Sequence, residues 1–357
     1  MLILLSSGAT RRYRDDIVRA LALPTGAELQ FRYDRSYVDG SLLAEIDANK
    51  LQEEQAIVVY LATDKDQLQT GYVPCRFVTV VGAEAVGSSY IVRLRIGSFV
   101  ADCGDTKLRA DLSPDEDALL PKWKSTTGAG AILEGKFFFR TRSGLSGIPT
   151  DSLTAFESTA TALSRYKDFA GAQSTVFYSI RRLVSGQRNI GLSERSVTSM
   201  VNGTYSLSSG QQYEMEIYCF LPPGAETKSA TLHISSDVEA VLLPLGNTRG
   251  IDSRYDLKRF PLRVERQVGN VSAGLHVYMT DTENENKAYS DIILPVFFRG
   301  SLLLAAARVA VIGIGTSGPA MIAANSAGKL NLGIALLMLL LGCVAGLGTV
   351  VSTLKRA

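Results

Sequence analysis

The chain has 357 residues, enough for two or three domains, and its net charge is only +2, from 37 basic and 35 acidic residues. This balance excludes a strong overall field that would select nucleic acid or anionic lipid. The four cysteines are scattered in no metal-ligand spacing, so we expect neither a metal site nor a disulfide framework, and the set favours a reducing compartment.

We expect residues 1–148 to form a mixed α/β domain. The opening apolar run, Leu2 to Leu5, is too short for a signal peptide and precedes the charges, so it is interpreted as a first strand. Short helices are predicted after Thr10 and over 41–51, and the acidic stretch 113–117 is interpreted as a solvated turn. Further strands are predicted at 31–38, 56–61, 73–81, 90–100 and 136–141, where apolar residues run on or alternate with polar ones.

A connecting helix is expected within 149–172. Apolar residues recur at three- and four-residue steps from Leu153 to Tyr166, Asp151 or Ser152 can cap the helix, and Gly171 follows it. Residues 173–300 then read as short strands separated by turn residues, which predicts a β-sandwich-like domain. The fold class is therefore α+β.

The C-terminal region, 301–357, contains two apolar segments, 302–324 and 332–354. The second carries no charged residue, and about 20 apolar residues are enough to cross a bilayer. Basic residues lie at both of its ends, where they can reach the headgroups. Gly342 and Gly346 form a GxxxG pattern that favours close helix packing.

Three interpretations of segment 302–324 remain open. It is either a span with a broken centre, a re-entrant segment lining a water-filled path, or an interfacial helix. We prefer a transmembrane helical hairpin in the inner (cytoplasmic) membrane, because the basic residues around it then place the soluble region in the cytoplasm. The residues assigned to the membrane path or to packing are Arg308, Gly313, Gly315, Thr316, Ser317, Pro319, Gly342 and Gly346.

The chain shows no catalytic motif. His233 and His276 both lie in predicted strands, and neither a GxSxG nor a Walker A sequence is present. We therefore expect no enzyme and no cofactor. Arginine forks suit phosphate, and Tyr13 and Tyr178 lie near two of the arginine clusters, where they could stack on bases. The candidate phosphate-binding residues are Arg11, Arg12, Arg14, Arg140, Arg142, Arg181, Arg182 and Arg188.

A soluble block over 1–300 followed by two apolar segments is similar to the layout of bacterial anti-phage membrane effectors. Among these the chain most resembles the effector of Hailong-type systems, which is paired with a nucleotidyltransferase. The resemblance implies a homo-oligomeric channel in the bilayer that a nucleotide or oligonucleotide gates and that depolarises the membrane during infection. It carries over no site residue.

Two other functions stay open. One is a tail-anchored adaptor that recruits a protein partner to the membrane and conducts no ions. The other is a membrane-bound hydrolase with a carboxylate site that sequence motifs do not reveal.

Overall fold

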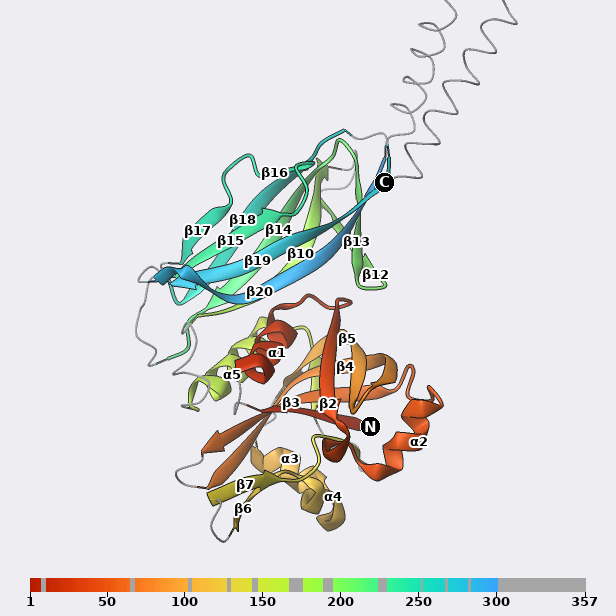
Figure 1. Cartoon of the computed structure of the whole chain (residues 1–357). Helices are drawn as coiled ribbons and strands as arrows, with labels where there is room; N and C mark the ends of the chain where they lie inside the picture. The colour runs from red at the N-terminus through yellow and green to blue at the C-terminus, as the bar shows by residue number, and fades with distance from the viewer. Residues whose placement is uncertain are drawn as a thin grey trace, which may run out of the picture.

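The computed structural model describes residues 1–7, 11–64, 68–101, 105–126, 130–142, 147–166, 176–188, 195–223, 230–251, 253–266, 269–281 and 284–300. Within these residues the protein is mostly β with some helices, and Figure 1 shows two bodies with α1 (Arg11–Ala22) and α5 (Leu153–Ser164) between them. No helix in this part of the chain is long and apolar enough to cross a bilayer. Both expected membrane segments, 302–324 and 332–354, lie outside the described residues.

The first body is built on a mixed, curled sheet in which the first strand of the chain lies between β3 and the end strand β8. Strand β1 pairs in parallel with β3 and antiparallel with β8, and it is buried on both faces, as its continuous apolar sequence predicts. The strand order is β2-β5-β4-β3-β1-β8, and β9 pairs with β5. Their bounds are β1 (Leu2–Ser7), β2 (Glu28–Asp34), β3 (Gln55–Asp64), β4 (Gln69–Val86), β5 (Ser89–Ala101), β8 (Phe138–Arg140) and β9 (Ile148–Thr150).

The sheet curls until its two ends meet, because β2 and β8 come together at a seam. The 3-10 turn η1 (Arg35–Tyr37) follows β2, and Val38 then forms a parallel bridge with Phe138 of β8. The Tyr33 hydroxyl donates to the carbonyl oxygen of Leu5 at 3.1 Å, and its ring stacks on Phe138 with centroids 5.6 Å apart. The side chain of Tyr33 and backbone hydrogen bonds of residues 37–39, rather than a continuous ladder along β2, therefore close the seam.

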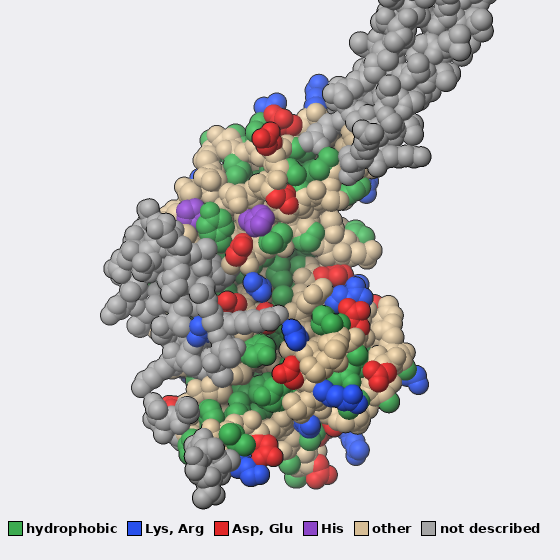
Figure 2. Space-filling model, viewed as in Figure 1, with side chains coloured by type: hydrophobic (Ala, Val, Ile, Leu, Met, Phe, Trp, Pro, Cys, Tyr) green, Lys and Arg blue, Asp and Glu red, His purple; other side chains and the backbone are tan. Residues whose placement is uncertain are grey.

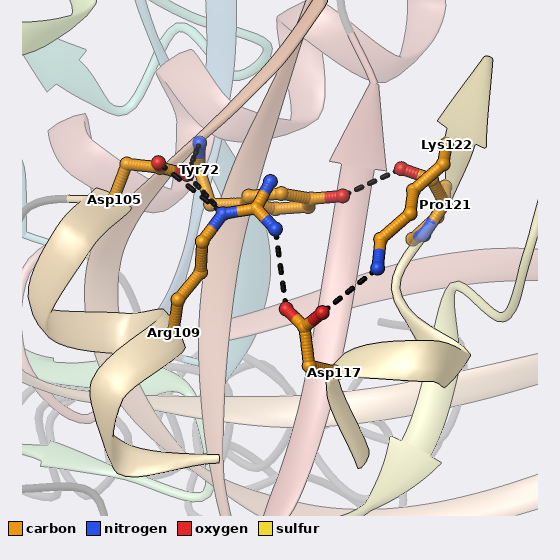
Figure 3. A network of polar contacts seen from close by, with 6 residues as sticks. All are labelled: Tyr72, Asp105, Arg109, Asp117, Pro121 and Lys122. Atoms are coloured by element: carbon orange, nitrogen blue, oxygen red, sulfur yellow. Dashed lines mark hydrogen bonds and ion pairs between the residues drawn. The ribbon is translucent and has the colours of Figure 1, made fainter. Parts of the chain in front are cut away.

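Helices α1 and α5 cover one face of this sheet, and α3 (Asp105–Asp111), α4 (Pro114–Leu119) and the hairpin of β6 (Lys122–Thr126) and β7 (Gly130–Glu134) cover the other. A polar network holds the second layer in place. The Tyr72 hydroxyl donates to the Pro121 carbonyl oxygen at 2.5 Å, and the Arg109 guanidinium lies over the Tyr72 ring. Burial raises the pKa of Tyr72 to about 12. The network comprises Tyr72, Asp105, Arg109, Asp117, Pro121 and Lys122 (Figure 3).

Two local predictions were wrong. The stretch 113–117 is not a turn but the start of α4, because Ser113 and Glu116 form a capping box and Pro114 occupies the first helical turn. Glu116 is buried and also accepts a hydrogen bond from the backbone N–H of Arg142. The helix expected over 41–51 is shorter, since α2 (Gly40–Asp47) ends before Asn49, which has a positive φ of 51°.

The second body consists of two curled sheets that share a core. One has the order β11-β10-β14-β18-β16, and the other has the order β12-β13-β20-β19-β15-β17 with β13 parallel to β20. The Tyr178 hydroxyl of one sheet donates to the Val277 carbonyl oxygen of the other at 3.2 Å. Their bounds are β10 (Phe177–Arg188), β11 (Arg195–Thr198), β12 (Met200–Val201), β13 (Thr204–Ser208), β14 (Gln212–Phe220), β15 (Ala230–Ser236), β16 (Val241–Leu242), β17 (Thr248–Ile251), β18 (Tyr255–Val264), β19 (Val271–Asp281) and β20 (Asn284–Arg299).

The two bodies meet through α1 and α5. Helix α1 packs against β10 and β20, and α5 begins at Leu153 after the expected cap, Ser152. Phe156 of α5 meets Tyr218 and Phe220 of β14 edge to face, at centroid distances of 6.0 and 6.5 Å. The Tyr218 hydroxyl donates to Glu157 at 2.5 Å. An aromatic and hydrogen-bonded junction therefore joins the bodies.

Candidate ligand cavity at the seam of the N-terminal sheet

A cavity of about 200 Å³ lies at the seam where β1 and β2 approach each other. Its floor is the carboxyl end of β1, its sides come from α1 and β2, and residues 133 and 137 close it from the α4 side. The carboxyl end of a parallel strand is a common place for ligands in α/β sheets, because the chain turns away there and leaves a crevice. The lining residues are Leu5, Ser6, Ser7, Tyr13, Asp16, Phe31, Arg32, Tyr33, Tyr37, Leu133 and Phe137.

Aromatic side chains dominate the walls. Tyr37 and Phe137 have ring centroids 4.8 Å apart at an interplanar angle of 59°, and Phe31 meets Tyr33 edge to face at 6.3 Å. Burial raises the pKa of Tyr33 well above its ordinary value, so this hydroxyl stays protonated and donates to Leu5. Rings arranged in this way can stack on a flat ligand and exclude water from it.

The polar groups of the walls come from α1 and β1. The Ser6 hydroxyl donates to the Tyr13 carbonyl oxygen at 2.7 Å and so ties the end of β1 to the first turn of α1. Asp16 is the one carboxylate among the described lining residues, and its side chain is 12% exposed. Arg32 contributes to the wall, but its guanidinium donates to the Ser89 hydroxyl at 3.0 and 3.1 Å. The cavity can therefore bind a small ring system and orient it by hydrogen bonds.

The first predicted arginine cluster begins α1 next to this cavity. The side chains of Arg11 and Arg12 lie outside the described residues. Arg14 is buried, with 8% of the residue exposed, so it does not present a fork to solvent. A phosphate-binding role for Arg11 and Arg12 remains a prediction.

None of the other predicted arginines whose side chains are described lines the cavity. Arg140 binds Glu45 with both terminal nitrogens, at 2.8 and 2.7 Å, and also contacts Glu54 at 2.6 Å. Carboxylates therefore already occupy this guanidinium, and a phosphate would have to displace them. Arg142, also predicted as a phosphate ligand, has an exposed side chain.

The third cluster lies on β10. Arg182 forms an ion pair of 2.6 Å with the nearly buried carboxylate of Glu216, and Arg181 is exposed. Tyr178 is only 3% exposed and points into the shared core, so it cannot stack on a base beside these arginines. The side chain of Arg188 lies outside the described residues.

Sequence reasoning named Tyr13 and missed the rest of the cavity. The signal was present in the sequence, because residues 6–10 join a buried strand to a helix with small polar residues, the composition of a binding loop in strand–loop–helix units. The contributions of Tyr33, Tyr37 and Phe137 had no such signal, since they depend on the closure of the seam. Among the described residues, no group of three or more His, Cys, Asp or Glu side chains could hold a metal ion.

Comparisons with known proteins do not identify a family. No family model matches the chain, and no curated protein does so. A PapD-like domain of human CEP192 is similar over 28% of this chain and 80% of its own, at 9% identity and a TM-score of 0.21. The CsuC–CsuE chaperone–adhesin pre-assembly complex of Acinetobacter baumannii is similar over 28% of this chain and 54% of its own, at 9% identity and a TM-score of 0.20.

The VesB protease of Vibrio cholerae is similar over 65% of this chain and 83% of its own, at 9% identity and a TM-score of 0.18. All three scores are low. The description of the fold therefore rests on the strands and sheets of this chain itself.

Proposed function

We propose that this chain is a membrane-anchored effector whose β-rich region, in the cytoplasm, binds a ligand and gates an oligomeric channel. In this proposal the second body is a β-sandwich, residues 301–357 form a transmembrane hairpin in the inner membrane, and the chain catalyses no reaction. The biological setting proposed is anti-phage defence.

The observation that carries the proposal is that one helix joins the cavity to the strand that leads to the C-terminal region. Tyr13 and Asp16 of α1 line the cavity. One turn further along α1, the Arg19 Nε donates to the Asp291 carbonyl oxygen of β20 at 3.4 Å. Strand β20 ends at Arg299, a few residues before the apolar segment 302–324. A ligand that shifts α1 would therefore shift β20.

The shape of the cavity favours a nucleotide or oligonucleotide that places one base inside. Stacking on aromatic side chains tolerates any base, because every base has a π face. At about 200 Å³ the cavity is smaller than the pockets that enclose drug-sized ligands, so it fits one ring system. Asp16 can accept hydrogen bonds from the N–H groups of a base edge. The sugar and phosphates would lie outside, toward the start of α1, where Arg11 and Arg12 stand in the sequence.

Ion flux from liposomes that contain the purified full chain tests this function. We expect a change in flux with one member of a panel of mononucleotides, cyclic nucleotides and short oligonucleotides. Tyr37→Ala should weaken that response, because Tyr37 forms a wall of the cavity. The matched control is Tyr255→Ala, an aromatic residue that is 52% exposed on the other body. Absence of flux under every ligand would refute the channel.

An exchange of residues 302–357 for an unrelated membrane anchor separates the channel from the adaptor. A channel loses its function after this exchange, whereas an adaptor keeps it. Protection of cells against phage, measured as plating efficiency, is the readout in vivo.

A further inference from the structure

The end of the second body from which the C-terminal region departs gathers several exposed arginines. Turn residue Ser209 donates its backbone N–H to the Arg299 carbonyl oxygen at 3.0 Å, and Gly210 donates to that of Val264 at the same distance. Arg263 and Arg266 flank Val264, and a Cβ built at Gly210 would meet Arg266 Cγ at 3.1 Å. One turn therefore places the ends of β18 and β20 side by side.

Three of these arginines are not neutralised by the protein. Arg263, Arg266 and Arg299 are exposed, and none forms an ion pair with a residue that the structure describes. This distinguishes them from Arg140 and Arg182, which carboxylates occupy. Figure 2 shows basic side chains, with acidic ones beside them, at this end of the body.

Acidic residues are present at this end but fewer. Glu265 stands between Arg263 and Arg266, and its backbone N–H donates to Ala240, the neighbour of Glu239. Both glutamates are exposed. Leu242, 40% exposed, lies opposite Arg263 in the β16–β18 ladder and adds an apolar side chain to the surface. Among the described side chains, the three arginines at this end outnumber the two glutamates.

We propose that this surface, which we call the exit face (Leu242, Arg263, Arg266 and Arg299), docks on anionic phospholipid headgroups of the bilayer. The proposal rests on membrane anchoring by residues 301–357 and deepens it. The apolar segment 302–324 begins within three residues of Arg299, so an inserted segment holds the exit face near the headgroups. Arginine forks bind phosphate in two-point geometry, and basic residues next to a membrane segment are attracted to anionic lipid. Docking fixes the angle between the second body and the bilayer.

The test uses the full chain, with Cys103 and Cys343 replaced by serine and Ser208→Cys carrying an environment-sensitive fluorophore. Ser208 is exposed and pairs with Arg299, so the label reports on the exit face. The protein is inserted into vesicles of phosphatidylcholine alone, or with about one third phosphatidylserine. Flotation after an alkaline wash shows whether the anchor has inserted.

We expect anchoring in both kinds of vesicle but a blue-shifted emission only with phosphatidylserine. The shift should disappear near 1 M salt, where the screening length falls to about 3 Å. The Arg263→Ala, Arg266→Ala, Arg299→Ala variant should lower the ratio of docked to undocked protein by roughly fivefold for each arginine removed. The control removes three other exposed arginines, Arg35, Arg93 and Arg142, and should leave the emission unchanged.

The outcomes separate the two proposals. A chain that floats with both vesicles but shows no lipid-dependent shift overturns the docking and leaves the anchor intact. The same conclusion follows if the triple variant behaves as its control does. A chain that does not float after the alkaline wash overturns the anchor and the docking together.

Discussion

The pKa of Glu116 allows a change in stability to be calculated. Its carboxylate caps α4 and also accepts a hydrogen bond from the backbone that follows β8. Its Oε2 accepts from the Ser113 N–H at 2.9 Å, and its other oxygen accepts from the Arg142 N–H. Burial by itself would raise the pKa of Glu116, but these hydrogen bonds outweigh it and lower the pKa to about 2. The charged form is therefore the one that the fold stabilises.

The fall from the ordinary value of 4.5 to about 2 corresponds to roughly 3 kcal/mol. Because the pKa is lowered in the folded state, this stability is present above pH 4.5 and is lost as the pH falls toward about 2. Glu116→Gln keeps the shape of the cap but removes the charge. We expect it to lower the free energy of unfolding by about 1–3 kcal/mol near neutral pH, and by progressively less below pH 4.5.

The chain contains a single tryptophan, Trp123, whose indole N–H donates to the Gln69 carbonyl oxygen at 3.1 Å. It lies on β6 beside α4, so its fluorescence in urea reports the unfolding of this layer in the detergent-solubilised full chain. Glu116→Gln and the unmodified chain are compared between pH 7 and pH 3. If the two free energies of unfolding hardly differ at neutral pH, or if their difference does not shrink on acidification, the assignment of the lowered pKa to this cap is refuted.

Three further predictions use the same urea assay. Tyr72→Phe leaves the Pro121 carbonyl oxygen without its donor and should cost about 1–3 kcal/mol; an unchanged midpoint would show that the bond contributes nothing. Gly203→Ala places a Cβ 2.8 Å from Glu28 Cγ at a φ of +72°, so a loss of about 1–2 kcal/mol or more is expected. Because Gly203 lies in the β12–β13 turn of the second body, its unfolding in urea is followed by circular dichroism instead of Trp123 fluorescence, and equal stability would contradict the strained geometry. Arg140→Lys loses the two-point contact with Glu45 and should lower the free energy of unfolding by under about 1 kcal/mol, since the pair is one-third exposed. High salt should reduce this difference between the variant and the unmodified chain.

Local patterns predicted the strands well because their chemistry is local. Leu2 to Leu5 became β1, and the alternation from Tyr90 became β5. Asn202 and Gly203 form a turn with positive φ angles of 49° and 72°, which this dipeptide adopts in tight hairpins. The capping box at Ser113 has a local signature too, a serine followed three residues later by glutamate, but the proline and acidic residues of the same stretch favour a solvated turn, and the two local signals conflict.

The cavity could not be predicted in the same way, because its walls come from distant parts of the chain. Tyr13, Tyr37 and Phe137 are brought together only when the sheet curls and β2 meets β8. The arginine clusters show the converse problem. Their spacing in the sequence suggests phosphate sites, but whether a carboxylate such as Glu45 or Glu216 reaches them depends on tertiary packing.

The position of β1 has a consequence for the order in which the chain can fold. This strand precedes both of its neighbours in the chain, since β3 and β8 begin at Gln55 and Phe138. Closing such long loops is entropically costly and slows folding. During synthesis the apolar residues 2–5 can pair on one side once β3 has been made, but their other side stays unpaired until β8 follows. A chain released before residue 138 would leave one edge of β1 exposed and prone to aggregation.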